Sequence, residues 1–310
     1  MKKKIDIHNN ALILLYHGVT SNSYNDIKNY SGKHLHINNF SKQMKILSSS
    51  CNTVSLRKLS EMLTNRKKLP YRTVAVTFDD CFQNIYHNAL PVLKKYKIPA
   101  TFFINTGYIG TDRIIWTDIL ELIIADYKEE RINFNFIDFS KDYNTATNEQ
   151  KIKTLLDIKS IIKSIDENKK QKIMKYFSNH HQLKLSKTTT DLYLNLNWNH
   201  IKEIDSDDLF EIGAHTVNHI ILSYVDLETA KKEIINSKKM IEQNLRKTVD
   251  LFSYPEGQEN HYNDDIIQIL KEQNFLCSPS AIWGDNEPGA DLFHLKRIMV
   301  GFNNIIFPYF

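Results

Sequence analysis

The sequence has few cysteines and no long apolar run. Three cysteines occur in 310 residues, an odd number without CxxC spacing: Cys51, Cys81 and Cys277. This pattern excludes a disulfide framework and fits a reducing compartment. No segment approaches the roughly 20 apolar residues that a membrane-spanning helix needs, so we expect no transmembrane segment. An internal repeat and an extended linker rich in Pro, Gly or Ser are absent as well.

The N-terminus resembles the start of a signal peptide only in its lysines. The apolar stretch Ala11–Tyr16 that follows them is too short for the hydrophobic region of such a peptide. No small-residue cleavage site comes after it. We therefore expect a cytoplasmic protein.

Charge of either sign is not in large excess. Lys and Arg total 40 and Asp and Glu total 36, which gives a net charge of +4. This slight bias is spread along the chain and does not indicate a nucleic-acid partner. Hydrophobic residues make up 42%, enough for a large core. The length allows two domains of about 150 residues, but a single α/β barrel of about 250 residues with an insertion fits equally well.

Short, nearly continuous apolar runs alternate with amphipathic helical patterns. Such runs are typical of parallel strands that are covered on both faces. The predicted strands are Ala11–Tyr16, Val74–Phe78, Ala100–Asn105, Phe210–Ala214, Leu251–Tyr254 and Arg297–Phe302, with Asn52–Leu56 and Phe275–Ser278 as weaker candidates. The predicted helices are Asn39–Ser50, Ile85–Tyr96 with Pro91 in its first turn or at a kink, Leu227–Leu245 and Asp264–Asn274. Repeated strand–helix pairs predict a right-handed parallel arrangement.

Residues 111–198 interrupt this rhythm. They are rich in Lys, Asn, Ile and Asp, and we predict several helices there, including Trp116–Tyr127 and Gln150–Ser164. We interpret the chain as one barrel domain over residues 1–310, with residues 111–198 as a helical insertion between two barrel units. Two roles are open for this segment: a cap over the barrel mouth, or a solvated decoration without a part in the chemistry.

Polar residues stand at the ends of the predicted strands. In a parallel barrel these ends meet at one mouth, where active sites are built. The residues in question are His17, Asp79, Asp80, Asn105, His215 and Tyr254. So many ligand-capable groups at one mouth are hard to explain by packing alone.

Two of these strand ends carry the parts of a hydrolytic metal site. Asp79 and Asp80 point in opposite directions if the strand geometry continues, so one can face a metal and the other a water molecule. Taken alone, the pair could equally cap the following helix. His215 and His219 share one face if they lie on a helical turn, so both imidazoles can reach one ion. Together the two halves predict a metal centre.

Three motifs in this order resemble the polysaccharide deacetylase family, which is carbohydrate esterase family four with its NodB-homology domain. They are TFDD ending at Asp80, HTVNH from His215 to His219, and FSYPEG ending at Gly257. The segments LLYHGV, ATFFINTGYIG and LKRIMV resemble a bacterial branch of this family. The resemblance covers most of the chain except the insertion. It implies a distorted parallel (β/α) barrel and metal-dependent hydrolysis of an N-acetyl or related acyl group from a sugar.

The resemblance also implies roles for individual residues. Asp79 would be the catalytic base, and Asp80, His215 and His219 would bind the metal. Bound metal would activate a water and polarise the carbonyl, and Asp79 would take the water proton. The stretch Ser253–Gly257 would line the substrate groove, with a backbone N–H near the tyrosine or glutamate holding the oxyanion. The groove residues implied are Tyr254, Pro255 and Glu256.

The chain departs from the family pattern at the general acid. Many members carry LxH late in the chain, where this sequence reads HLKRIMV. His294 and His17 are both candidates for the acid, while Arg297 could instead orient Asp79 through a charge-assisted contact. FSYPEG lacks the Arg that often precedes its proline, which favours the Arg297 hypothesis.

Two further positions bear on the groove and on the metal. Cys81 stands where the family commonly has Gly, and we interpret it as a small apolar filler rather than an extra soft ligand. Aromatic rings can stack on sugar faces, and Trp116 and Trp283 are the candidates we favour for this role, although core packing explains most of the aromatic residues.

We predict a cytoplasmic, metal-dependent carbohydrate N-deacetylase. The ion is predicted to be Zn²⁺, and a His₂Asp site also accepts Ni, Co or Fe. The substrate is predicted to be an acylated amino sugar in a glycan or a glycan precursor, and both a nucleotide-linked and a lipid-linked precursor fit this prediction. The alternatives are an O-acetyl esterase, an amidase on a non-sugar substrate, and a non-catalytic glycan-binding barrel.

Overall fold

A parallel β-sheet forms the centre of the computed structural model, which describes residues 6–80, 82–136, 139–180 and 190–302. Cys81 lies outside the described residues. The strands run in the order β10-β1-β5-β6-β9, with β4 paired to β5, and all their pairings are parallel. Their bounds are β1 Leu12–Tyr16, β4 Asn52–Thr53, β5 Thr73–Phe78, β6 Ala100–Ile104, β9 Phe210–Ala214 and β10 Ile298–Met299.

The register aligns the carboxyl ends of the strands. Tyr16 pairs with Phe78, and Phe78 pairs with Phe102 on the next strand. Every residue of β1, β5 and β6 is buried, which explains their continuous apolar sequences. The residues directly after these strands therefore lie along one edge of the sheet.

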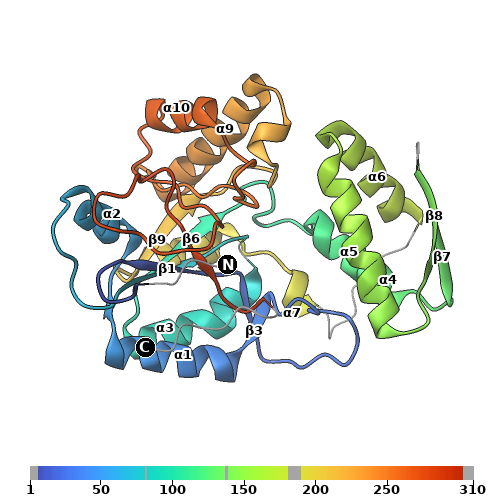
Figure 1. Ribbon diagram of the computed structural model, residues 1–310, viewed down its shortest axis with the longest axis horizontal. Helices are drawn as coiled ribbons and strands as arrows, with labels where there is room; N and C mark the ends of the chain where they lie inside the picture. The colour runs from blue at the N-terminus through green and yellow to red at the C-terminus, as the bar shows by residue number, and fades with distance from the viewer. Residues whose placement is uncertain (1–5, 81, 137–138, 181–189, 303–310) are drawn as a thin grey trace.

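Helices cover both faces of the sheet. Figure 1 shows α1 and α3 below the strands and α9 and α10 above them. The helices of this body are α1 Ile37–Ser50, α2 Leu56–Thr64, α3 Leu90–Tyr96, α8 Trp198–Asp205, α9 Leu227–Leu245 and α10 Asp264–Glu272. A π-helical turn at Ile85–Ala89 precedes α3, and Pro91 lies in the first turn of α3, where its missing N–H costs little. Among the described residues, no helix is both long and apolar enough to span a bilayer.

The closed barrel is not confirmed by the strand pairing, since β9 and β10 end the described ladder without pairing to each other. The predicted strands Leu251–Tyr254 and Phe275–Ser278 are present only as isolated parallel bridges. These bridges join Ala214 to Phe252, Leu251 to Cys277, and Pro279 to Leu295. Irregular backbone thus replaces regular ladder on this side of the sheet.

Much of segment 111–198 forms a second packed unit beside the sheet, at the right of Figure 1. It contains α4 Trp116–Asp126, β7 Arg131–Phe136, β8 Phe139–Asn144, α5 Asn148–Ser164 and α6 Glu167–His180. The short α7 Thr190–Tyr193 lies next to the body instead, in contact with β2 Gly18–Thr20 (Figure 1). The expected helical insertion also contains a pair of strands that was not predicted, β7 and β8, which form an antiparallel hairpin. Ile132 and Phe134 alternate with exposed neighbours and bury against α4 and α5, which is the period of a strand.

A small parallel ladder stands beside the carboxyl end of β1. It pairs β2 Gly18–Thr20 with β3 His34–His36. A Cβ atom at Gly18 would lie 1.9 Å from the Nδ1 atom of His34, so only glycine allows this close approach. The ladder places residues 17 and 33 next to the aligned strand ends.

Candidate metal centre

Asp79 and Asp80 follow β5 at the aligned edge of the sheet. The Asp79 amide continues the ladder by donating to the Tyr16 carbonyl at 3.0 Å. Asp80 has a φ of 73°, in the left-handed region, so the strand ends there and the expected strand alternation does not continue. Both carboxylates are nearly inaccessible, at 4% and 6% exposure. Strained backbone of this kind is often found at functional sites.

His215 follows β9 at the same edge, and His219 lies in the loop after it. The predicted helical turn was wrong, because Thr216 and His219 both adopt positive φ and the segment is a loop. Glu233 of α9 fixes this loop by accepting the amides of Val217 and Asn218 at 2.9 and 2.8 Å. The loop still brings the two rings together, with centroids 5.1 Å apart.

The two histidines and Asp80 form a compact three-residue cluster. Oδ1 of Asp80 is 3.2 Å from Nε2 of His219 and 3.7 Å from Nε2 of His215. The three possible ligand atoms lie within 4.8 Å of one another. Buried Asp80 Oδ1 has no hydrogen-bond donor among the described residues. A buried acceptor facing two imidazole nitrogens fits a cation, and His₂Asp leaves positions open for water and substrate.

A hydrogen bond fixes the orientation of one ligand ring. Nδ1 of His215 lies 2.7 Å from the carbonyl oxygen of Ser253. Nδ1–H must be the donor in this bond, so Nε2 keeps its lone pair and faces the cluster. This is the arrangement that a metal-binding histidine requires.

Burial and mutual charge set the protonation of the cluster. Burial lowers the pKa of His215 to about 4, although Asp79 opposes this shift. Burial also disfavours the charged form of His219, but the nearby carboxylate of Asp80 outweighs it and raises the pKa of His219. Burial would raise the pKa of Asp80, yet His219 and His17 hold it well below its usual value. The acid is therefore ionised and His215 is neutral at pH 7, as ligation demands.

Asp79 is held by Arg297 rather than by the histidines. Nη1 of Arg297 donates to Oδ1 at 2.9 Å, and Nη2 donates to Oδ2 at 2.7 Å. Ser253 Oγ lies 3.3 Å from Oδ2, and His215 Nε2 lies 3.8 Å from it. Burial would raise the pKa of Asp79, but the positive charge of Arg297 outweighs it and lowers the pKa. Asp79 is thus a fixed, ionised acceptor at the side of the cluster.

A cavity of about 580 Å³ opens onto these groups. Of the residues predicted for the site, seven line it: His17, Asp79, Asp80, His215, His219, Tyr254 and Glu256. Arg297 lies behind Asp79 and is only 1% exposed. Pro255 is not among the described residues that line the cavity.

His294 lies away from this cavity and hydrogen-bonds Asp291 at 3.0 Å. Its side chain is half exposed, while that of Arg297 is fully buried. The segment alternates in the manner of a strand, so Leu295 and Arg297 face inward and His294 faces outward. The late histidine therefore does not join the other candidates.

His17 lies inside the cavity, beyond the end of β1. Its buried Nδ1 has no hydrogen-bond partner within the described residues, and its ring makes an edge contact with Phe302 at 5.1 Å. Burial lowers the pKa of His17, and the charges of Asp80 and Asp79 oppose the shift. Among the three candidates for the acid or orienting role, His17 is the imidazole that lies in the cavity.

The groove motif lies on the opposite rim. Tyr254 is buried and stacks on Tyr262 at 3.9 Å, while its hydroxyl donates to the Phe293 carbonyl. The Tyr254 amide points at the Pro279 carbonyl at 3.5 Å, a long contact. Glu256 has a φ of 59° and pairs with Lys163 at 2.6 Å.

The two tryptophans do not join the cavity of the metal centre. Trp116 lines a second cavity with Tyr108 and Lys170. Trp283 lines neither of these two cavities within the described part of the chain.

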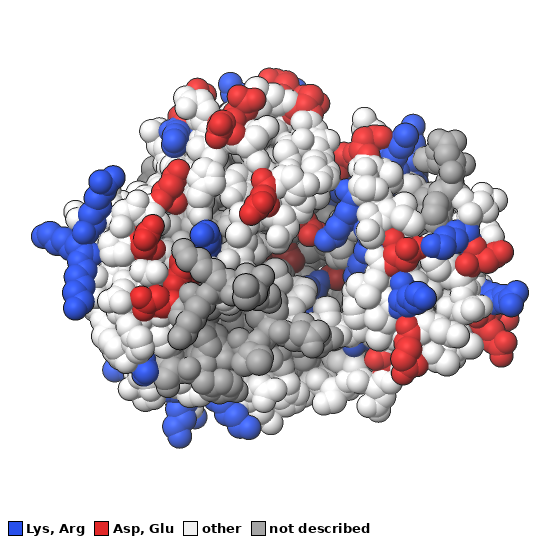
Figure 2. All heavy atoms as spheres, viewed as in Figure 1, with Lys and Arg blue, Asp and Glu red and all other residues white. Residues whose placement is uncertain are grey.

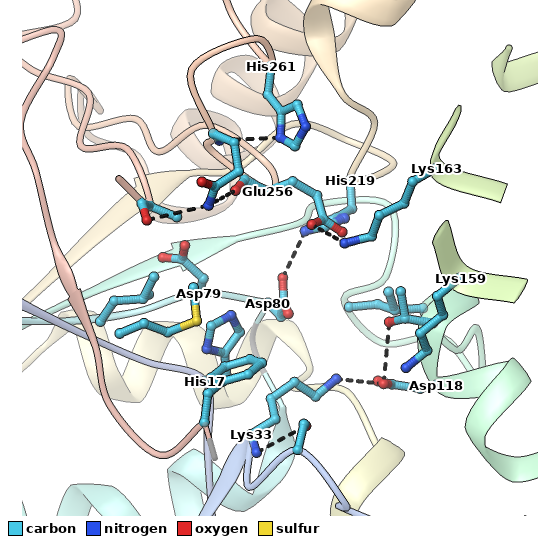
Figure 3. Close-up of a pocket in the computed structure, with 18 of the residues that line it drawn as sticks. His17, Lys33, Asp79, Asp80, Asp118, Lys159, Lys163, His219, Glu256 and His261 are labelled. Atoms are coloured by element: carbon cyan, nitrogen blue, oxygen red, sulfur yellow. Dashed lines mark hydrogen bonds and ion pairs between the residues drawn. The ribbon is translucent and has the colours of Figure 1, made fainter. Parts of the chain in front are cut away.

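Sequence reasoning missed the charged residues on the wall that faces the metal centre. They are Glu121 and four residues labelled in Figure 3, Lys33, Asp118, Lys159 and Lys163; His261, also missed, lines the cavity on the side of Glu256. The spacing of Lys159 and Lys163, four residues apart on a predicted helix, was the one available signal, and it is common on solvated helices. Figure 2 shows blue and red side chains together in the hollow between the body and the helical unit.

Comparisons with known families and sequences match deacetylases of acetylated polysaccharides. A family model described as polysaccharide deacetylase matches residues 66–277. A poly-beta-1,6-N-acetyl-D-glucosamine N-deacetylase of Staphylococcus aureus is 39% identical over 125 residues, covering 36% of this chain and 41% of that protein. The Staphylococcus epidermidis protein of that name is 31% identical over 166 residues, covering 49% and 56%. The chain thus spans about half the length of these curated relatives.

Solved structures agree on the fold. IcaB from Ammonifex degensii superposes with a TM-score of 0.60 at 20% identity, covering 94% of this chain and 92% of that one. The Streptococcus pyogenes deacetylase PplD, solved in complex with acetate, gives 0.60 at 19% identity, covering 96% and 94%. At such identities the likeness establishes an α/β fold built on a parallel sheet.

Proposed function

Because the chain belongs to the polysaccharide deacetylase family, we propose that it is a metal-dependent hydrolase that removes an N-acetyl or related acyl group from an amino sugar. The observation that carries this proposal is the cluster of Asp80, His215 and His219 beside the ionised Asp79 in one cavity. The names of the staphylococcal relatives support the acetylated amino sugar as substrate.

Asp80, His215 and His219 would hold the ion, with Zn²⁺ as the first expectation and Ni, Co or Fe as further occupants. When bound, a divalent ion lowers the pKa of a coordinated water and polarises an acyl oxygen. Ser253 keeps the His215 ring oriented through its carbonyl. The strained backbone at Asp80 and His219 places both side chains toward the same point.

Asp79 would act as the general base. Its two hydrogen bonds from Arg297 fix both oxygens, so the carboxylate needs no reorientation to meet a water proton. Arg297 is buried and does not line the cavity, so it would act by positioning Asp79 and keeping it ionised. This is the orienting role that the sequence left open.

His17 would protonate the leaving amine. It lines the same cavity as Asp79 and Asp80, whose charges oppose the effect of burial on its pKa. Burial disfavours the imidazolium, which makes the protonated ring a stronger acid once it has received a proton. The alternative is a purely structural role, in which His17 stabilises the cavity rim by packing against Phe302.

We interpret the isolated bridges at Ala214, Leu251 and Pro279 as the irregular side of a distorted (β/α) barrel within one domain over residues 1–310. Segment 111–198 would be the insertion in this barrel, and its residues in the cavity wall favour a cap over a mere decoration.

The cellular location of the enzyme and the linkage of its substrate stay predictions. A cytoplasmic enzyme would act on a precursor, with a nucleotide-linked or lipid-linked sugar as the expected form. Fractionation of the native host, followed by immunodetection, tests the location. A signal found only outside the cytoplasm would contradict it.

Release of acetate together with a new free amine tests the reaction. Wild-type protein loaded with Zn²⁺ should release both from N-acetylated glucosamine oligomers, and Asp79→Asn should lower the rate by at least about 100-fold. Release of acetate from O-acetyl sugars alone would favour an esterase, and turnover of non-sugar amides alone would favour an amidase. Stoichiometric metal without turnover on any of these would favour a glycan-binding barrel.

A further inference from the structure

The helical unit supplies one wall of the cavity that contains the metal centre. Asp118 and Glu121 come from α4, and Lys159 and Lys163 lie four residues apart on one face of α5. Lys33, directly before β3, completes the wall. Figure 3 shows the three lysines on the side of the cavity away from Asp79.

Two of these lysines already have a carboxylate. Lys33 Nζ pairs with Asp118 Oδ1 at 2.6 Å, in a pair with side-chain exposures of 13% and 2%. Lys163 Nζ pairs with Glu256 Oε2, also at 2.6 Å. Lys33 is therefore neutralised within the wall, and Lys163 is neutralised by a carboxylate of the opposite rim.

The remaining acid of the wall is satisfied by uncharged donors. Oε1 of Glu121 accepts the amide of Asn29 at 2.8 Å and the hydroxyl of Tyr193 at 3.0 Å. Burial and the charge of Asp118 raise the pKa of Glu121, so this acid is a weaker source of negative charge than its neighbours.

Lys159 differs from both other lysines. It makes no ion pair and no hydrogen bond with any residue that the structure describes, and its Nζ lies 5.2 Å from the centre of the Tyr30 ring. Burial lowers the pKa of Lys159 to about 8, although Glu121 and Asp118 oppose the shift. At pH 7 the group is therefore mainly an ammonium ion without an anion of its own.

We propose that Lys159 binds an anionic group of the substrate, a phosphate or a carboxylate carried next to the acylated amino sugar. This inference rests on the proposed function and names the class of sugar that the cavity selects. The overall charge agrees: with a divalent ion bound and neutral histidines, the ion, three lysines and Arg297 carry six positive charges against five lining carboxylates. A bound anion would neutralise this excess and give Lys159 its missing partner.

Binding of reaction products, which are not turned over, tests the assignment. Isothermal titration of the Zn²⁺-loaded protein compares glucosamine 1-phosphate with the methyl glycoside of glucosamine. Lys159→Gln should lower the affinity for glucosamine 1-phosphate about tenfold, as expected for the loss of one charge-assisted contact of ~1.4 kcal/mol. The affinity of Lys159→Gln for the neutral glycoside should differ from that of the wild type by less than about twofold. Lys159→Arg should retain most of the affinity for glucosamine 1-phosphate. A disaccharide of glucosamine and a uronic acid shows whether a carboxylate serves as well as a phosphate.

A matched control lies on the same helix. Lys153 is exposed on α5 and does not line the cavity, so Lys153→Gln removes the same charge from the same element. Equal affinity of Lys159→Gln and wild type for both anionic probes would overturn the inference, as would equal weakening by Lys153→Gln. Acetate release from a neutral N-acetylglucosamine oligomer, measured in parallel, distinguishes failure of this inference from failure of the proposed function. If the oligomer is turned over but Lys159→Gln does not change the affinity for the anionic probes, only the anion site is contradicted.

Discussion

Arg297 donates two parallel hydrogen bonds to Asp79, and its Nη2 also bonds Ser253 Oγ at 2.9 Å. Ser253 in turn accepts the ring N–H of His215 through its carbonyl. The proposed base and one proposed metal ligand are therefore held by contacts that meet at a single serine. A substitution of Arg297 should therefore disturb the positions of both Asp79 and His215.

Removal of Arg297 should destabilise the protein strongly. Arg297→Met leaves the buried carboxylate of Asp79 without its cation, which typically costs about 3–5 kcal/mol. Arg297→Lys keeps the charge but loses the bidentate geometry, so its cost should be smaller. The free energy of unfolding from urea denaturation measures both.

Arg57 provides the control for this prediction. It pairs with Asp250 through the same bidentate geometry, with both contacts at 2.6 Å, but its side chain is 44% exposed. Arg57→Met should cost about 1 kcal/mol or less, because solvent screens an exposed pair. An equal loss in the free energy of unfolding for Arg57→Met and Arg297→Met would contradict the claim that burial makes the Arg297–Asp79 pair more important for stability.

Substitution of His17 should affect the chemical step and leave the metal in place. His17→Ala should lower kcat on an N-acetyl sugar by about 10²–10⁴-fold, the usual contribution of a general acid. An activated aryl ester, whose leaving group needs no proton, should be hydrolysed at nearly the wild-type rate. A parallel loss on both substrates would assign His17 to packing instead of proton transfer.

The ion pair between Lys163 and Glu256 joins α5 to the groove motif across the cavity. Their side chains are 40% and 20% exposed, so solvent screening should limit the coupling energy to about 0.5–1 kcal/mol. A double-mutant cycle with Lys163→Gln and Glu256→Gln measures it through KM and through the free energy of unfolding. We expect KM to rise and kcat to stay nearly constant, and additive single effects would show that the contact does not hold α5 in place.

Binding of an anionic probe should weaken as the pH rises through about 8. The pKa of Lys159 is lowered to about 8 by burial, so at pH 9 only about a tenth of the molecules keep the ammonium charge. The groups that face it are Glu121, Asp118, Lys33 and Lys163, and of these Lys33 has a raised pKa and stays charged.

The affinity for glucose 1-phosphate, which lacks the 2-amino group that would itself titrate near pH 8, should therefore fall between pH 7 and pH 9 in the wild type. It should stay flat in Lys159→Arg, because a guanidinium does not titrate in this range. The second pKa of a phosphate ester is about 6, so about nine-tenths of the probe is doubly charged at pH 7, and its remaining ionisation would raise the affinity with pH instead of lowering it. A fall of the same size in both proteins would assign the titration to another group.

The sequence was sufficient to predict the strands that carry the centre. β9 and α9 have the bounds expected from the pattern, since a short buried strand and a long amphipathic helix each leave a clear period. Asp79, Asp80 and His215 stand directly after buried strands, so the parallel arrangement alone brings them to one edge. The loop conformation at His219 was not predictable, because positive φ at a non-glycine residue leaves no mark in the sequence.

The wall of the cavity could not be predicted for a different reason. Lys159 and Lys163 look like ordinary solvated residues of an amphipathic helix until α5 is packed against the body. Lys33 reaches the same cavity from a loop more than 100 residues earlier in the chain. Long-range packing decides such convergence, and neither periodicity nor motif spacing encodes it. The hairpin β7–β8 was missed because the lysine-rich and asparagine-rich composition of its surroundings hid a short alternating pattern.

Metal content tests the central claim most directly. Purified wild type, His215→Ala and His294→Ala are loaded with Zn²⁺, dialysed and measured by plasma mass spectrometry. We predict one equivalent in the wild type and in His294→Ala, whose imidazole lies outside the cavity, and much less than half an equivalent in His215→Ala. Equal zinc in His215→Ala and the wild type would contradict the ligand assignment and the hydrolase built on it.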